Sequence, residues 1–170
     1  MKAPFPPLTE KLQNVQGQID GAVNIAGGFV WEPIEGGTLD SWDRMYRLNL
    51  RIATVSSRAA LPYLTTGASI VNVGAAAAAG VSIGMTPYAA SKAGVMALSE
   101  SFADELKAKG VRVNAVLSTV IDTPVNRMDM PDADTSTWVK PASAVKVIAF
   151  LLSNDAASIT GAGLRLSLAG

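Results

Sequence analysis

The 170-residue sequence contains neither cysteine nor histidine. The missing cysteines exclude disulfides, thiolate metal sites and cysteine nucleophiles, and the missing histidines exclude serine–histidine triads and imidazole acid–base catalysis. Charged residues are scarce, at 16% against roughly 25% in an ordinary soluble chain. The 14 basic side chains balance 14 acidic ones, so charge gives no reason to expect a nucleic acid or an anionic membrane as partner. We expect no metal site, and any chemistry has to come from tyrosine, lysine, serine, threonine, asparagine or carboxylates.

The N-terminus lacks the apolar run that marks a signal peptide. The longest uncharged stretch, 59–91, is long enough to cross a bilayer. Glycines and prolines divide it into short pieces, however, and we interpret these as buried strand and loop. No membrane segment is therefore expected, and the lack of a signal and of cysteine favours a cytoplasmic protein.

Short apolar runs alternate with helical patterns along the chain. We expect strands at 22–26, 69–73, 111–117 and 162–168, helices at 9–17, 40–64, 87–109 and 142–152, and a polar loop at 122–140. Strands that alternate with helices form parallel βαβ units, in which helices cover both faces of the sheet. The pattern therefore predicts an α/β fold with four strands.

Tyr88 and Lys92 lie four residues apart in one predicted helix and so share a face. A lysine charge beside a phenol favours the phenolate and lowers the tyrosine pKa, so the tyrosine can act as a general acid or base. The alternative is a surface helix with a solvated lysine and a half-buried tyrosine. The short pattern alone does not decide between the two.

Five motifs follow one another in a fixed order. They are Asn24-Ile25-Ala26-Gly27 after a strand, Asn49 within a long helix, Tyr88-x-x-x-Lys92, Val113-Asn114-Ala115, and Ile159-Thr160-Gly161-Ala162. From about Ile19 to Gly170 the set resembles the short-chain dehydrogenase/reductase family. The resemblance implies a Rossmann-like parallel sheet flanked by helices and truncated to about four strands, the family's strands four to seven. Residues 1–18 then form a leader with a short helix, and residues 19–170 the C-terminal part of the domain.

Within that family the chain is similar to the dihydropteridine reductases. The similarity rests on segment 122–134 with Trp138, and on Ala26-Gly27-Gly28 followed by Phe29 and Trp31. In most of the family a serine about thirteen residues before the tyrosine holds a substrate carbonyl oxygen, and here Ala75 takes that position. The pteridine branch likewise lacks this serine, so Ala75 favours that branch or a loss of activity.

The resemblance implies a role for each site residue. Tyr88 would donate the proton that accompanies hydride transfer, Lys92 would bind the nicotinamide ribose and lower the tyrosine pKa, and Asn49 would hold a water of a proton relay. The remaining assignments are Asn24, Ala26 and Gly27 along the adenosine side of NAD or NADP, Thr123 at the nicotinamide amide, and Trp31 and Ala75 at a small-molecule substrate.

Several of these residues also have a purely structural interpretation. Asn49 could be a core asparagine satisfied by backbone, Asn24 could tie neighbouring strands together, and Thr123 could cap a helix together with Asp122. For Phe29 core packing is the better interpretation. Trp138 is open between core packing and substrate contact.

No Gly-x-x-x-Gly-x-Gly turn, with which the family holds the cofactor pyrophosphate, precedes Asn24. We therefore expect the first three family strands to be missing, the choice between NAD and NADP to be unreadable, and the strand at Val23 to have an open edge. That edge would need a cover from the leader, another chain or strand exchange.

Two functions stay open at this point. One is an NAD(P)H-dependent oxidoreductase that reduces a quinonoid pteridine-like ring, and the other is a catalytically inactive, truncated family member that acts as a dimerising scaffold or is a fragment. The helices near 40–64 and 87–109 form the usual interface of the family. They predict a homodimer or homotetramer in either case.

Overall fold

The computed structural model describes residues 17–168, so the helix expected from Thr9 and nearly all of the leader lie outside the described residues. Four parallel strands form one sheet in the order β1-β2-β3-β4. Their bounds are β1 Ile19–Asn24, β2 Leu64–Val73, β3 Arg112–Ser118 and β4 Gly163–Leu166. The predicted α/β class and the four strands are confirmed.

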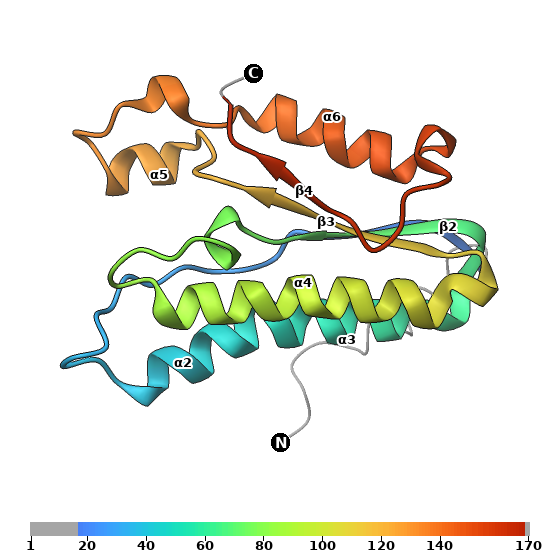
Figure 1. Ribbon diagram of the computed structural model, residues 1–170, viewed down its shortest axis with the longest axis horizontal. Helices are drawn as coiled ribbons and strands as arrows, with labels where there is room; N and C mark the ends of the chain where they lie inside the picture. The colour runs from blue at the N-terminus through green and yellow to red at the C-terminus, as the bar shows by residue number, and fades with distance from the viewer. Residues whose placement is uncertain (1–16, 169–170) are drawn as a thin grey trace.

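Helices cover both faces of this sheet, as Figure 1 shows. One layer holds α2 (Leu39–Met45), α3 (Ile52–Ala60) and the long α4 (Thr86–Leu106), and the opposite layer holds α6 (Pro141–Leu152). The short α5 (Pro124–Asp129) lies near the end of the sheet toward which the strand arrows point. No helix within residues 17–168 combines the length and the apolar character needed to cross a membrane.

The two central strands alternate their side chains between two cores. On the α4 face, Ile70 and Val113 pack with Leu106. On the α6 face, Val71 and Val116 pack with Leu151, and all four strand residues are at most 1% exposed. Because both faces are covered, these strands read in the sequence as unbroken apolar runs rather than as alternating patterns.

Several element boundaries differ from the sequence expectation. Strand β1 starts at Ile19 instead of residue 22, because the exposed Asp20 and Gly21 interrupt the apolar run. The helix expected over 40–64 is divided by a π-helical turn, Tyr46–Arg51, and gives way to β2 already at Leu64. The loop expected over 122–140 contains α5, which is too short to show a helical period.

Strand β1 forms one edge of the sheet, and β4 forms the other. Within residues 17–168 β1 pairs with β2 alone, in a register that places Ala22 beside Ile70 and Asn24 beside Asn72. The open edge predicted at Val23 is therefore present in the part of the chain that the structure describes.

Candidate active site

Most candidate residues gather at the carboxyl ends of β1 and β2, whereas Thr123 follows β3. The segment after β1 (residues 25–38), the segment after β2 (residues 74–85) and the first turns of α4 meet there. In open parallel sheets this end of the strands is where ligands bind.

Tyr88 and Lys92 share a face of α4, as their spacing predicted. Lys92 is 5% exposed, and its ammonium donates a hydrogen bond of 2.8 Å to the carbonyl oxygen of Val73. Its Nζ lies 6.0 Å from the centroid of the Tyr88 ring. The alternative of a solvated lysine on a surface helix is therefore wrong.

Burial controls the pKa of both groups. It lowers the pKa of Lys92 to about 8 and raises the pKa of Tyr88 above its usual value of 10.0. The expectation that Lys92 lowers the tyrosine pKa is not met in this structure. The reason is physical: the ammonium hydrogen bonds to Val73 and not to the phenol, so loss of hydration dominates at both groups.

Asn49 is 1% exposed and lies on the π-helical turn. Its Oδ1 accepts a hydrogen bond from the Gly28 amide at 2.9 Å, and its Nδ2 donates to the Gly28 carbonyl at 3.0 Å and to Ser91 Oγ at 2.9 Å. The interpretation as a core asparagine satisfied partly by backbone is confirmed. A role in a proton relay stays a prediction.

Gly27 brings the first loop against these groups. A Cβ at this position would lie 2.6 Å from Asn49 Oδ1 and 3.3 Å from Lys92 Nζ. Only glycine fits here without displacing Asn49. The exposed backbone at Ala26 and Gly27 therefore runs past the Lys92 ammonium.

Asn24 serves the core of the sheet. Its Nδ2 donates to Asn72 Oδ1 at 2.7 Å and to Ser57 Oγ at 2.9 Å, and Asn72 donates in turn to Ser99 Oγ at 2.8 Å. The interpretation as a tie between strands is confirmed, and contact of Asn24 with a cofactor stays a prediction.

Thr123 caps α5. Its Oγ1 accepts a hydrogen bond from the Asn126 amide at 3.2 Å, as the structural interpretation proposed. Beside it, Asp122 forms two hydrogen bonds with Arg127, of 2.5 and 2.9 Å, and this guanidinium lowers the pKa of the Asp122 carboxyl. Contact of Thr123 with a nicotinamide stays a prediction.

The loop after β1 carries two exposed aromatic side chains, of which Phe29 lies beside the candidate catalytic tyrosine. Phe29 meets Tyr88 edge to face, with the ring centroids 5.0 Å apart, and is 54% exposed, so the expectation of core packing was wrong. Trp31 is 58% exposed and lies against Gly84. The Glu32 amide donates to the Gly84 carbonyl at 2.8 Å and so joins the two loops.

The other two substrate candidates are buried. Ala75 is 4% exposed at the start of a short 3-10 turn, Ala76–Ala78, and Trp138 is 6% exposed. Ala75 therefore offers a ligand no hydroxyl and little surface. For Trp138, which the sequence left open, the structure favours packing.

Three partners in this site escaped the sequence reasoning: Ser91, the amide and carbonyl of Gly28, and the carbonyl of Val73. Ser91 could have been found, because it follows Tyr88 by three residues and so lies on the same helical face. The backbone groups carry no side-chain signal.

The donor set is suited to hydroxyl groups. An ammonium has three donors, and Lys92 directs one of them to Val73. The other two can serve the hydroxyls of a ribose, beside a glycine backbone that leaves room for a close approach. In residues 17–168 no group of acidic side chains is arranged to hold a metal ion.

Comparison with known proteins agrees with this geometry. A family model described as enoyl-(acyl carrier protein) reductase matches residues 5–166. The 3-oxoacyl-(acyl carrier protein) reductase of Thermotoga maritima is 32% identical over 91% of this chain and 67% of its own length. A crystal structure of a short chain dehydrogenase from Burkholderia cenocepacia in complex with NADP is 31% identical, with a TM-score of 0.87 over 95% of this chain and 69% of the other. The chain belongs to the short-chain dehydrogenase/reductase family.

This member of the short-chain dehydrogenase/reductase family spans only part of the length of its relatives. It covers 54% of the (3R)-3-hydroxyacyl-CoA dehydrogenase of Rattus norvegicus, to which it is 35% identical over 75% of its own length. The activities and substrates in the names of these longer relatives therefore describe those proteins.

Proposed function

We propose that the chain is an NAD(P)H-dependent oxidoreductase in which Tyr88 supplies the proton that accompanies hydride transfer. The observation that carries the proposal is the buried Lys92 ammonium, 6.0 Å from the Tyr88 ring centroid and facing the Gly27 backbone. A solved relative in complex with NADP supports the cofactor class. When bound, the nicotinamide supplies the hydride.

The residues of this chain then have distinct tasks. Lys92 holds ribose hydroxyls with its free donors, and Gly27 permits the approach because it has no side chain. Tyr88 keeps its proton until transfer, because burial raises its pKa. Its phenol thereby acts as the general acid of the reduction.

We propose a flat quinonoid ring of the pteridine type as the substrate. Phe29, which meets the Tyr88 ring, and Trp31, which lies against Gly84, present exposed aromatic surface that suits a planar ring. Ala75 has no hydroxyl with which to hold a ketone oxygen, and this argues against ordinary keto substrates. A 3-oxoacyl thioester is the test substrate that represents ordinary keto compounds, because a relative is a 3-oxoacyl-(acyl carrier protein) reductase.

The test is a titration of the chain with NADH and NADPH followed by fluorescence, together with turnover of a quinonoid dihydropterin and of acetoacetyl-CoA. We expect saturable binding at micromolar concentrations and turnover of the dihydropterin. For Tyr88→Phe we expect a loss of turnover of about a hundredfold or more, because the general acid is gone, while cofactor affinity stays nearly unchanged.

Three results would contradict this proposal. The absence of binding at millimolar cofactor would leave the chain without an oxidoreductase function of its own. Unchanged turnover in Tyr88→Phe would remove Tyr88 from the chemistry, and preference for acetoacetyl-CoA would overturn the choice of substrate.

We also propose that two copies associate through the outer face of α2–α3 together with α4. Tyr46 and Val55 are each 51% exposed on this layer, and α4 adds the exposed small residues Ala93 and Ala97. Small side chains let helices approach closely, and the exposed apolar surface supplies the driving force.

A further inference from the structure

We propose that Ser91 is a positioning residue that fixes the Gly27–Gly28 backbone relative to Tyr88. The proposal rests on the function proposed above, because it concerns the geometry of that same site. Ser91 lies between the tyrosine and the lysine in the sequence and is 6% exposed. Within residues 17–168 it connects three elements: α4, the π-helical turn and the loop after β1.

The connection is a chain of three contacts. The Ser91 hydroxyl donates to the Tyr88 carbonyl at 2.7 Å and accepts from Asn49 Nδ2 at 2.9 Å. Asn49 in turn holds both the amide and the carbonyl of Gly28, at 2.9 and 3.0 Å. Every polar atom of the Asn49 side chain is thus engaged, and its orientation depends on Ser91 at one end and on Gly28 at the other.

The orientation of the Asn49 amide determines where the Gly27–Gly28 backbone lies relative to Lys92. The position of a Cβ on Gly27 would be only 2.6 Å from Asn49 Oδ1 and 3.3 Å from Lys92 Nζ. A rotation of the Asn49 amide would therefore move the loop that faces Lys92. Displacement of this loop is costly for catalysis because reacting groups must meet in a narrow range of geometries.

Helix α4 contains a matched second serine, Ser99, two turns further along. Its hydroxyl donates to the Val95 carbonyl at 2.8 Å and accepts from Asn72 Nδ2 at 2.8 Å, and it is fully buried. Ser99 thus makes the same kinds of contact as Ser91, with an asparagine amide and with a carbonyl of its own helix. Its asparagine belongs to the sheet core and does not contact the Gly27–Gly28 loop.

The experiment compares Ser91→Ala with Ser99→Ala in the whole chain. Each loses one buried hydroxyl, so we expect similar decreases of Tm by a few degrees. Amide hydrogen exchange, followed by NMR, then reports on the loop. We expect exchange of the Gly28 amide to accelerate about tenfold in Ser91→Ala, as the loss of one hydrogen bond worth about 1.4 kcal/mol implies, and to stay at the wild-type rate in Ser99→Ala.

Kinetics give a second measurement with the dihydropterin and NADH. In Ser91→Ala we expect kcat to decrease about tenfold with KM nearly unchanged, because geometry and not binding is lost, while Ser99→Ala keeps the wild-type kcat. Equal Gly28 exchange rates in the two variants would overturn the proposal. If the wild-type chain has no turnover at all, the proposed function fails, and hydrogen exchange alone still decides whether Ser91 positions the loop.

Discussion

At the residue scale, the buried Lys92 ammonium, which we propose to bind the cofactor, also carries a cost in stability. Its pKa is lowered to about 8 by burial, while an unfolded chain has a lysine pKa near 10.4. Between these values the unfolded state binds more protons than the folded state. The free energy of unfolding therefore rises as the pH increases from about 8 toward 10, and below pH 8 the buried charge exerts its full destabilising effect.

Lys92→Met tests this directly. We expect the variant to have the higher free energy of unfolding at pH 7, and the difference from wild type to shrink by about 2 kcal/mol between pH 7 and pH 10, because only the wild type gains stability as the lysine loses its proton. Urea unfolding at a series of pH values measures the difference. Lys109→Met, at an exposed lysine beyond α4, is the control that should follow the wild type, and a difference independent of pH would contradict the pKa shift.

The residues of the site were only partly predictable. Spacing alone placed Tyr88 and Lys92 on one face, because the helical period is fixed. Their pKa values could not be inferred from the sequence, since these depend on burial and on the direction of the ammonium toward Val73. Phe29 was misjudged for a related reason: an aromatic residue next to glycines gives no information on which side of the loop faces water.

At the element scale, the loops after β1 and β2 form one joined wall next to Tyr88. Gly84 has φ +75°, and a Cβ there would lie 2.4 Å from the Trp31 ring. This position therefore favours glycine twice, through its backbone conformation and through the packed indole.

We expect Gly84→Ala to displace Trp31 and to lower Tm by several degrees, because a left-handed backbone and a steric clash each cost about 1 kcal/mol or more. Intrinsic tryptophan fluorescence should shift to longer wavelength, and KM for the dihydropterin should rise about tenfold. Gly80→Ala provides the control in the same loop, since nothing lies within 4 Å of its added Cβ. Equal effects of the two substitutions would show that the wall does not depend on Gly84.

The elements themselves were predictable wherever burial is complete. The apolar runs at 69–73 and 111–117 predicted the central strands β2 and β3, although β2 begins already at Leu64, and the pattern at 87–109 predicted α4. The start of β1 and the division of the helix expected over 40–64 could not be predicted from the sequence. Pairing with β2 decides where β1 starts. The π-helical turn that carries Asn49 is produced by tertiary contacts, which local propensity does not encode.

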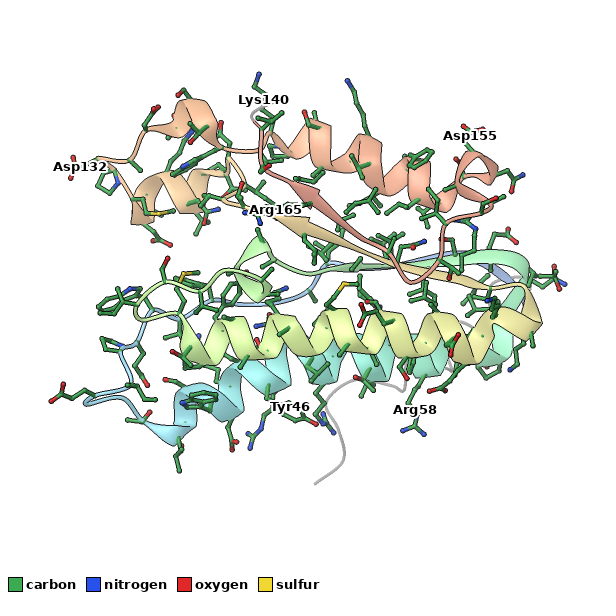
Figure 2. The ribbon with its side chains drawn as sticks, viewed as in Figure 1. Tyr46, Arg58, Asp132, Lys140, Asp155 and Arg165 are labelled. Atoms are coloured by element: carbon green, nitrogen blue, oxygen red, sulfur yellow. The ribbon has the colours of Figure 1, made fainter. Side chains whose placement is uncertain are left out.

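At the scale of the whole molecule, the two helix layers differ in what they expose. In Figure 2, Tyr46 and Arg58 both point away from the sheet on the outer side of the α2–α3 layer. Val55 on this layer is 51% exposed, and Val145 on α6, across the sheet, is 61% exposed. The proposed association uses the first surface and leaves the second free, and this asymmetry can be tested with one kind of substitution.

Val55→Glu should weaken the association of two copies by about a hundredfold, because a two-fold contact brings two new carboxylates into one desolvated surface and such like-charge juxtaposition costs several kcal/mol. Val145→Glu introduces the same charge at another exposed valine and should leave the mass of the assembly unchanged. Light scattering over a dilution series measures both variants against the wild type. The proposed interface is wrong if the wild type is monomeric at the highest concentration, or if Val145→Glu, and not Val55→Glu, dissociates the assembly.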